Sequence, residues 1–130
     1  RGIRLVDDSY NASPSSVTAA ISVLATTPAP RTAVLGDMLE LGDGAVDYHR
    51  EVGRHLADCG VERLLSVGSL ARHFGDVSGI QAEHFSDVNA LIARKPEFAA
   101  NETILVKGSR GVQLDQFVDS LSASVGVAQC

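Results

Sequence analysis

Five consecutive residues near the carboxyl end of the chain combine cations, a hydroxyl and glycines. The run Lys107-Gly108-Ser109-Arg110-Gly111 directly follows the apolar stretch Ile104-Leu105-Val106 and precedes a helix-like stretch. Two cations and a hydroxyl can bind an anion, and the glycines let backbone N–H groups approach it where the helix dipole favours negative charge. Lys107, Ser109 and Arg110 therefore predict a site for a carboxylate or a phosphate. The same residues are also typical of a turn with solvated charges.

This anion-binding run differs from the phosphate-binding loop of nucleotide hydrolases. Its lysine precedes the glycine, and no Gly-Lys-Ser or Gly-Lys-Thr triplet occurs anywhere in the chain. Any nucleotide must therefore have its main phosphate contacts outside this chain.

A second polar cluster, Asp7-Asp8-Ser9-Tyr10-Asn11, follows the apolar pair Leu5-Val6. The two carboxylates could accept hydrogen bonds from ribose hydroxyls or hold a cation, and Tyr10 and Asn11 could pack against a base and hydrogen-bond to it. The alternative is an acidic pair and an Asx turn that leads into a helix.

A third cluster, with Asp37 and Glu40, follows the apolar run Ala33-Val34-Leu35. Its carboxylates could bind an amine or a cation, or could serve only a turn. His49 is expected on the polar face of a helix. The four histidines and two cysteines have no metal-ligand spacing, so we predict no metal site in this chain.

The composition is that of an ordinary globular domain. The 130 residues are 45% hydrophobic and fit one domain spanning 1–130. Sixteen acidic and eleven basic residues give a net charge of −5, which argues against nucleic acid as a partner. No apolar run is long enough to cross a bilayer, and we expect a cytoplasmic protein without a membrane partner.

Strand-like and helix-like segments alternate along the chain. Strands are expected at residues 2–6, 32–35, 64–67, 84–85 and 103–106. Helices are expected after the Ser13-Pro14 start, at 46–58, at 69–74, after a Ser86 cap and from about Leu114, with a frayed end after Leu121. This order predicts an α/β fold with a doubly wound, mostly parallel sheet of about five to six strands and helices on both faces. The three polar clusters then share the carboxyl edge of the sheet, where such folds bind ligands.

Four ordered motifs resemble the C-terminal domain of the Mur ligases. They are Asp-Asp-Ser-Tyr-Asn-Ala-Ser-Pro from Asp7, Ala-Val-Leu-Gly-Asp-Met-Leu-Glu-Leu-Gly from Ala33, His-Arg-Glu-Val-Gly from His49 and Val-Lys-Gly-Ser-Arg-Gly from Val106. The resemblance covers nearly the whole chain and implies a Rossmann-like domain. It also implies that an N-terminal UDP-sugar domain and a central ATPase domain lie outside this chain. One position departs from the family pattern, since Ser13 stands where such ligases usually have Asn.

The resemblance implies an ATP-dependent amide ligation in peptidoglycan synthesis, in which D-Ala-D-Ala joins UDP-N-acetylmuramoyl-tripeptide. Asp8 then corresponds to the ribose ligand, with Tyr10 and Asn11 beside the adenine. Lys107, Ser109 and Arg110 correspond to the group that receives the dipeptide carboxylate or approaches the phosphates, and Asp37 is a further substrate-binding candidate. No catalytic residue is assigned within this chain. ATP and Mg²⁺ are expected to be held mainly by the central domain, in a monomeric enzyme, and the fragment alone is expected to be inactive.

Two alternatives belong to other functional classes. A phosphoacceptor receiver domain also places an acidic pair after its first strand and a lysine after its last, as Asp7-Asp8 and Lys107 would be. It needs an aspartate at the end of the third strand, where this chain has Gly68-Ser69. A stand-alone nucleotide-binding or dipeptide-binding module is the other alternative.

Overall fold

Helices and strands alternate through the computed structural model, which describes residues 3–9, 11–76, 78–124 and 127–129. The elements are, in chain order, β1 (Ile3–Asp8), α1 (Pro14–Leu24), β2 (Arg31–Gly36), η1 (Gly42–Gly44), α2 (Ala45–Asp58), β3 (Arg63–Val67), η2 (Ala71–Phe74), β4 (Gln81–Phe85), α3 (Val88–Arg94), β5 (Thr103–Lys107), η3 (Arg110–Val112), α4 (Asp115–Ser124) and β6 (Val127–Gln129).

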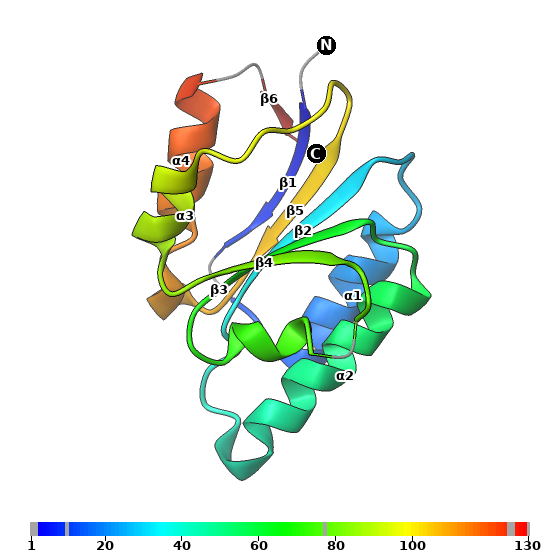
Figure 1. The fold of residues 1–130 in the computed structure, drawn as a ribbon, viewed down its shortest axis with the longest axis vertical. Helices are drawn as coiled ribbons and strands as arrows, with labels where there is room; N and C mark the ends of the chain where they lie inside the picture. The colour runs from blue at the N-terminus through cyan, green and yellow to red at the C-terminus, as the bar shows by residue number, and fades with distance from the viewer. Residues whose placement is uncertain (1–2, 10, 77, 125–126, 130) are drawn as a thin grey trace.

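The strands form one six-stranded sheet in the order β4-β3-β2-β5-β1-β6, with every neighbouring pair parallel (Figure 1). The chain runs outward from β1 through β2 and β3 to β4. It then returns to place β5 between β2 and β1, and adds β6 beside β1. The predicted doubly wound α/β fold is therefore confirmed. Because all strands are parallel, the segments that follow β1, β2 and β5 meet at one edge of the sheet.

Two hydrophobic cores lie on opposite faces of the sheet. α1 and α2 cover one face, and α3 and α4 cover the other (Figure 1). The helix residues buried in the first core are Val17, Ile21, Leu24, Val52 and Leu56, and those in the second are Val88, Leu91, Phe117, Val118 and Leu121. The central strand β5 is buried along its whole length, which explains its continuous run of branched apolar residues.

Side-chain caps define where two of the helices begin. The predicted Ser13 cap of α1 is confirmed: its hydroxyl accepts from the Ser16 N–H at 3.2 Å, and the Ser16 hydroxyl accepts from the Ser13 N–H at 2.9 Å. The predicted Ser86 cap of α3 is wrong by one residue. Asp87 takes that position, and its carboxylate accepts from the Ala90 N–H at 2.9 Å.

The frayed end predicted after Leu121 is also wrong. α4 continues to Ser124, and Val127–Gln129 form β6, which pairs with β1 in the register Ile3↔Val127. A three-residue strand is not stable alone, and here the open side of β1 supplies its main-chain partners. Among the described residues, no helix is long and apolar enough to cross a membrane.

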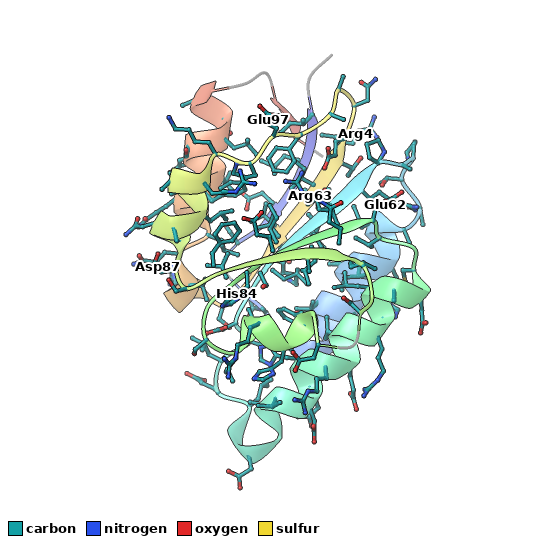
Figure 2. The ribbon with its side chains drawn as sticks, viewed as in Figure 1. Arg4, Glu62, Arg63, His84, Asp87 and Glu97 are labelled. Carbon is teal, nitrogen blue, oxygen red and sulfur yellow. The ribbon has the colours of Figure 1, made fainter. Side chains whose placement is uncertain are left out.

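A polar network closes the amino edge of the sheet, opposite the three polar clusters (Figure 2). Arg63 on β3 donates to the Glu97 carbonyl at 2.7 Å and lies over the Phe98 ring at 5.1 Å. The buried Glu102 accepts from the Ala99 N–H at 2.7 Å and from the Thr32 hydroxyl. The hydrogen bonds of these side chains hold the loop of residues 95–102 against the sheet. We therefore place the candidate site at the opposite, carboxyl edge.

Candidate functional site

The strand order brings the predicted clusters together at the carboxyl edge. β5 lies between β1 and β2, and its last residue, Lys107, is in register with Asp8 on one side and Leu35 on the other. The loop that follows β5 therefore reaches both the loop after β1 and the loop after β2. This proximity of residues about 100 and 70 positions apart follows from the topology alone.

Lys107 points into the protein rather than toward solvent. Its side chain is only 2% exposed, and its ammonium forms an ion pair with the Asp8 carboxylate and donates to the Asn11 carbonyl at 3.0 Å. The Asp8 side chain is 49% exposed, so this carboxylate also faces solvent, where a ligand hydroxyl could reach it. The lysine thus fixes the cluster after β1, including the exposed Asn11. Tyr10, the third residue predicted for this cluster, lies outside the described residues.

Ser109 joins the loops that follow β5 and β2. Its N–H donates to the Asp37 carbonyl at 3.0 Å, and its hydroxyl oxygen accepts from the Leu39 N–H at 2.9 Å. The hydroxyl proton remains able to donate to a ligand. Arg110, which starts η3, is exposed at the same edge. Of the three predicted anion ligands, Arg110 is therefore the one whose charge faces outward.

Two glycines allow these loops to touch. A Cβ added to Gly108 would lie 3.0 Å from the Gly36 Cα and 2.9 Å from a Leu114 methyl group. A Cβ on Gly36 would lie 2.9 Å from a Val112 methyl group. Side chains at either position would separate the end of β2 from the loop that carries Ser109 and Arg110.

Asp37 is nearly buried, and its carboxylate fixes the start of η2. One oxygen accepts from the Leu70 N–H at 3.0 Å and the Ala71 N–H at 2.7 Å. The neighbouring Gly68 has φ +115°, and a Cβ there would lie 2.4 Å from the same oxygen. The Asp37 carboxylate is therefore bonded within the protein and does not extend into solvent. It still borders a hollow in the surface.

That hollow has a volume of about 410 Å³ and lies between the loops after β2, β3 and β4 and the η3 segment. Its polar lining includes Asp37, Ser69, Ser86, Asp87 and Gln113. Figure 2 labels Asp87 at the start of α3. The volume is in the range of small-molecule sites, and it is large enough for a dipeptide.

His49 contradicts its predicted place on a polar helix face. Its side chain is fully buried, and its Nε2 lies 3.0 Å from the Met38 nitrogen. The sequence carried a usable signal, since His49, Val52 and Leu56 are spaced by three and four residues and so share one face of α2.

The described residues contain no group of three or more histidines, cysteines or acidic residues placed to hold a metal ion. The residues at the edge are suited instead to hydroxyl, amine and carboxylate ligands.

The chain matches the family described as "Mur ligase, glutamate ligase domain" over residues 1–110. It is 44% identical over 120 residues to the UDP-N-acetylmuramoyl-tripeptide–D-alanyl-D-alanine ligase of Escherichia coli K12, covering 90% of this chain and 26% of that protein. The ligase of the same name from Rickettsia prowazekii is 38% identical, with 89% and 27% coverage. The chain thus spans about a quarter of the length of these relatives.

Solved structures show the same fold. The MurF ligase from Thermotoga maritima, crystallised in complex with ADP, superposes with a TM-score of 0.80 at 24% identity, over 95% of this chain and 29% of that chain. A MurF structure from Acinetobacter baumannii gives a TM-score of 0.71 at 28% identity, over 91% and 27%.

Proposed function

This chain belongs to the Mur ligase family and is a C-terminal domain of that family. On that premise we propose that the whole protein uses ATP to join D-Ala-D-Ala to UDP-N-acetylmuramoyl-tripeptide. The observation that carries the proposal is the 44% identity over 90% of the chain to a ligase of that name. In this reaction ATP phosphorylates the tripeptide carboxylate, the dipeptide amine attacks the acyl phosphate, and ADP and phosphate leave.

The domain's part in the reaction is to receive the incoming dipeptide. We propose that its carboxylate binds at Arg110 and the Ser109 hydroxyl, beside the 410 Å³ hollow. The hollow is bordered by Asp37, whose negative charge suits the ammonium end of the same molecule. A cation and an anion near one hollow are complementary to a zwitterionic dipeptide.

The nucleotide contact of the domain is proposed at the end of β1. Asp8 is held by Lys107 and remains half exposed, which supports a role in accepting from the ribose. The placement of Tyr10 and Asn11 beside the adenine is proposed from the family resemblance. The chain has no phosphate-binding loop, and its described part has no cluster suited to a metal. We therefore propose that the central domain holds the phosphates and Mg²⁺.

We propose a monomer in the cytoplasm, where ATP and UDP-sugars are available, with no nucleic acid partner, as the net charge of −5 supports. A phosphoacceptor switch has less support, because β3 ends at Val67 and is followed by Gly68 rather than by an aspartate.

The test is phosphate release by the whole protein with ATP and each substrate in turn. Turnover that requires both the tripeptide and D-Ala-D-Ala supports the proposal, and turnover with a different amine donor contradicts it. The 130-residue chain alone should release no phosphate. If the chain alone turned over ATP and Lys107→Ala abolished that activity, the assignment of the phosphates to another domain would be wrong.

A further inference from the structure

The buried His49 connects α2 to the loop that follows β2. Its Nε2 lies 3.0 Å from the Met38 nitrogen, and its Nδ1 lies 2.6 Å from the Ala45 carbonyl oxygen. The ring packs against Phe74 with centroids 4.8 Å apart. These three contacts hold the ring in place, in a helix that otherwise contributes apolar residues to the core.

The two hydrogen bonds define the chemical state of the imidazole. The Met38 N–H can only donate, so Nε2 must be an unprotonated acceptor, and the Ala45 carbonyl can only accept, so Nδ1 must carry the proton. The pKa of His49 is lowered from its ordinary value, chiefly by burial and also by the nearby His73, and the opposing effects of the bond to Ala45 and the charge of Asp37 are smaller than that of burial. His49 is therefore the neutral tautomer with the proton on Nδ1.

A chain of hydrogen bonds leads from this acceptor to the proposed dipeptide site. Met38 is held by His49, and its neighbour Leu39 donates to the Ser109 hydroxyl at 2.9 Å. Ser109 in turn donates its N–H to the Asp37 carbonyl at 3.0 Å. His49 thus holds the backbone of residues 37–39, and the loop that carries Ser109 and Arg110 is hydrogen-bonded to this segment.

We propose that His49 is a positioning residue for the dipeptide site, acting through the acceptor that its Nε2 presents to the Met38 N–H. This proposal rests on the proposed function for the identity of the substrate, but not for the order of the loop. His49 does not line the hollow, so it acts on the site through residues 37–41. Loss of the acceptor should make residues 37–41 more mobile and leave the buried Met38 N–H without a hydrogen-bond partner.

Two substitutions separate the acceptor from the rest of the ring. In His49→Gln the side-chain amide reaches the position of Nε2, and its oxygen can accept from the Met38 N–H. In His49→Asn the side-chain amide matches Nδ1 and can still donate to Ala45, but it cannot reach Met38. Both variants remove the contact with Phe74, so both lose packing. His55→Asn is the matched control, because His55 lies on the same helix and contacts Ser22 at 2.9 Å instead of the loop.

The experiment uses the whole ligase and measures the KM for D-Ala-D-Ala and for ATP. His49→Asn should raise the KM for D-Ala-D-Ala about tenfold, which corresponds to ~1.4 kcal/mol, and change the KM for ATP less than about twofold. His49→Gln and the His55→Asn control should stay within about threefold of the wild type for both substrates. If Asn and Gln raise the KM equally, or if both substrates are affected alike, the acceptor does not position the site and the proposal is overturned.

Hydrogen exchange in the same proteins distinguishes this proposal from the proposed function. Amide exchange in a peptide covering residues 37–44 should speed up about tenfold in His49→Asn and remain near the wild-type rate in His49→Gln. If the wild type does not use D-Ala-D-Ala, the proposed function fails, while this exchange pattern would still support the positioning of the loop. Equal exchange in the two variants would overturn the positioning role whatever the substrate is.

Discussion

Replacing Asp8 by Asn should destabilise the domain more than removing its partner Lys107. The Lys107 side chain is 2% exposed, so Asp8→Asn leaves a charged ammonium inside the protein. Breaking a fully buried pair this way costs about 3–5 kcal/mol. Asp8 is 49% exposed, and the ammonium keeps the Asn11 carbonyl, so we expect about 2 kcal/mol. Lys107→Met instead leaves a carboxylate that water can reach, which should cost about 1 kcal/mol or less.

The assay is urea denaturation of the 130-residue chain with Asp8→Asn, Lys107→Met and the double variant. The double variant removes both charges, and it should be more stable than Asp8→Asn alone by about 1 kcal/mol. A larger cost for Lys107→Met than for Asp8→Asn would refute the reasoning, as would single costs that simply add in the double variant.

The same variants test the proposed ribose contact in the whole ligase. Asp8→Asn should weaken ATP use by roughly 1–3 kcal/mol, the range for a hydrogen bond to a charged group, with little change in the KM for D-Ala-D-Ala. The double variant should recover stability without recovering ATP use. Recovery of both would mean that Asp8 acts only on the fold.

Three further predictions address other parts of the domain. Arg110→Lys in the whole ligase should raise the KM for D-Ala-D-Ala about tenfold, because lysine cannot form a bidentate contact with a carboxylate, and an equal loss with the dipeptide amide would show that Arg110 does not bind that group. Gly53→Ala should destabilise the chain by about 3 kcal/mol in urea denaturation, because the new Cβ would lie 2.0 Å from the Phe74 carbonyl oxygen. Alanine normally favours a helix over glycine, so a gain in stability would contradict this packing. The free energy of unfolding should fall as the pH drops below about 6.5, because burial lowers the pKa of His49 in the folded state and the unfolded state therefore binds a proton there first. The fall with pH should be shallower in His49→Gln, and equal slopes of the unfolding free energy against pH in the two proteins would contradict a buried neutral ring.

Much of the fold was predictable because its strands are short apolar runs that stop at polar clusters. β1, β2 and β5 follow that rule, and the helices between them have apolar residues at helical spacing. The tail was not predictable in the same way. The segment Val127–Gln129 becomes a strand only because β1 presents an unpaired side, and strand order is not written in the local sequence.

The candidate site was predictable as a set of residues, but their orientations were not. The pattern after β5 placed two cations in the predicted anion site, whereas in the structure Lys107 is buried and paired with Asp8, and the Arg110 side chain is exposed. Similarly, Asp37 is nearly buried and bonded to backbone N–H groups. Sequence spacing indicates which side chains share an edge, while the direction of each side chain depends on partners many residues away.

The position of β1 between β5 and β6 sets an order of events on the ribosome. The partners of β1 are separated from it by about 100 residues, as in the pair Arg4↔Thr103, so within this domain β1 has no neighbouring strand until β5 has been synthesised. β2, β3 and β4 can associate before then. Until then the sheet of this domain lacks its central β5, and β1 joins it only through this long-range pairing, which should slow folding.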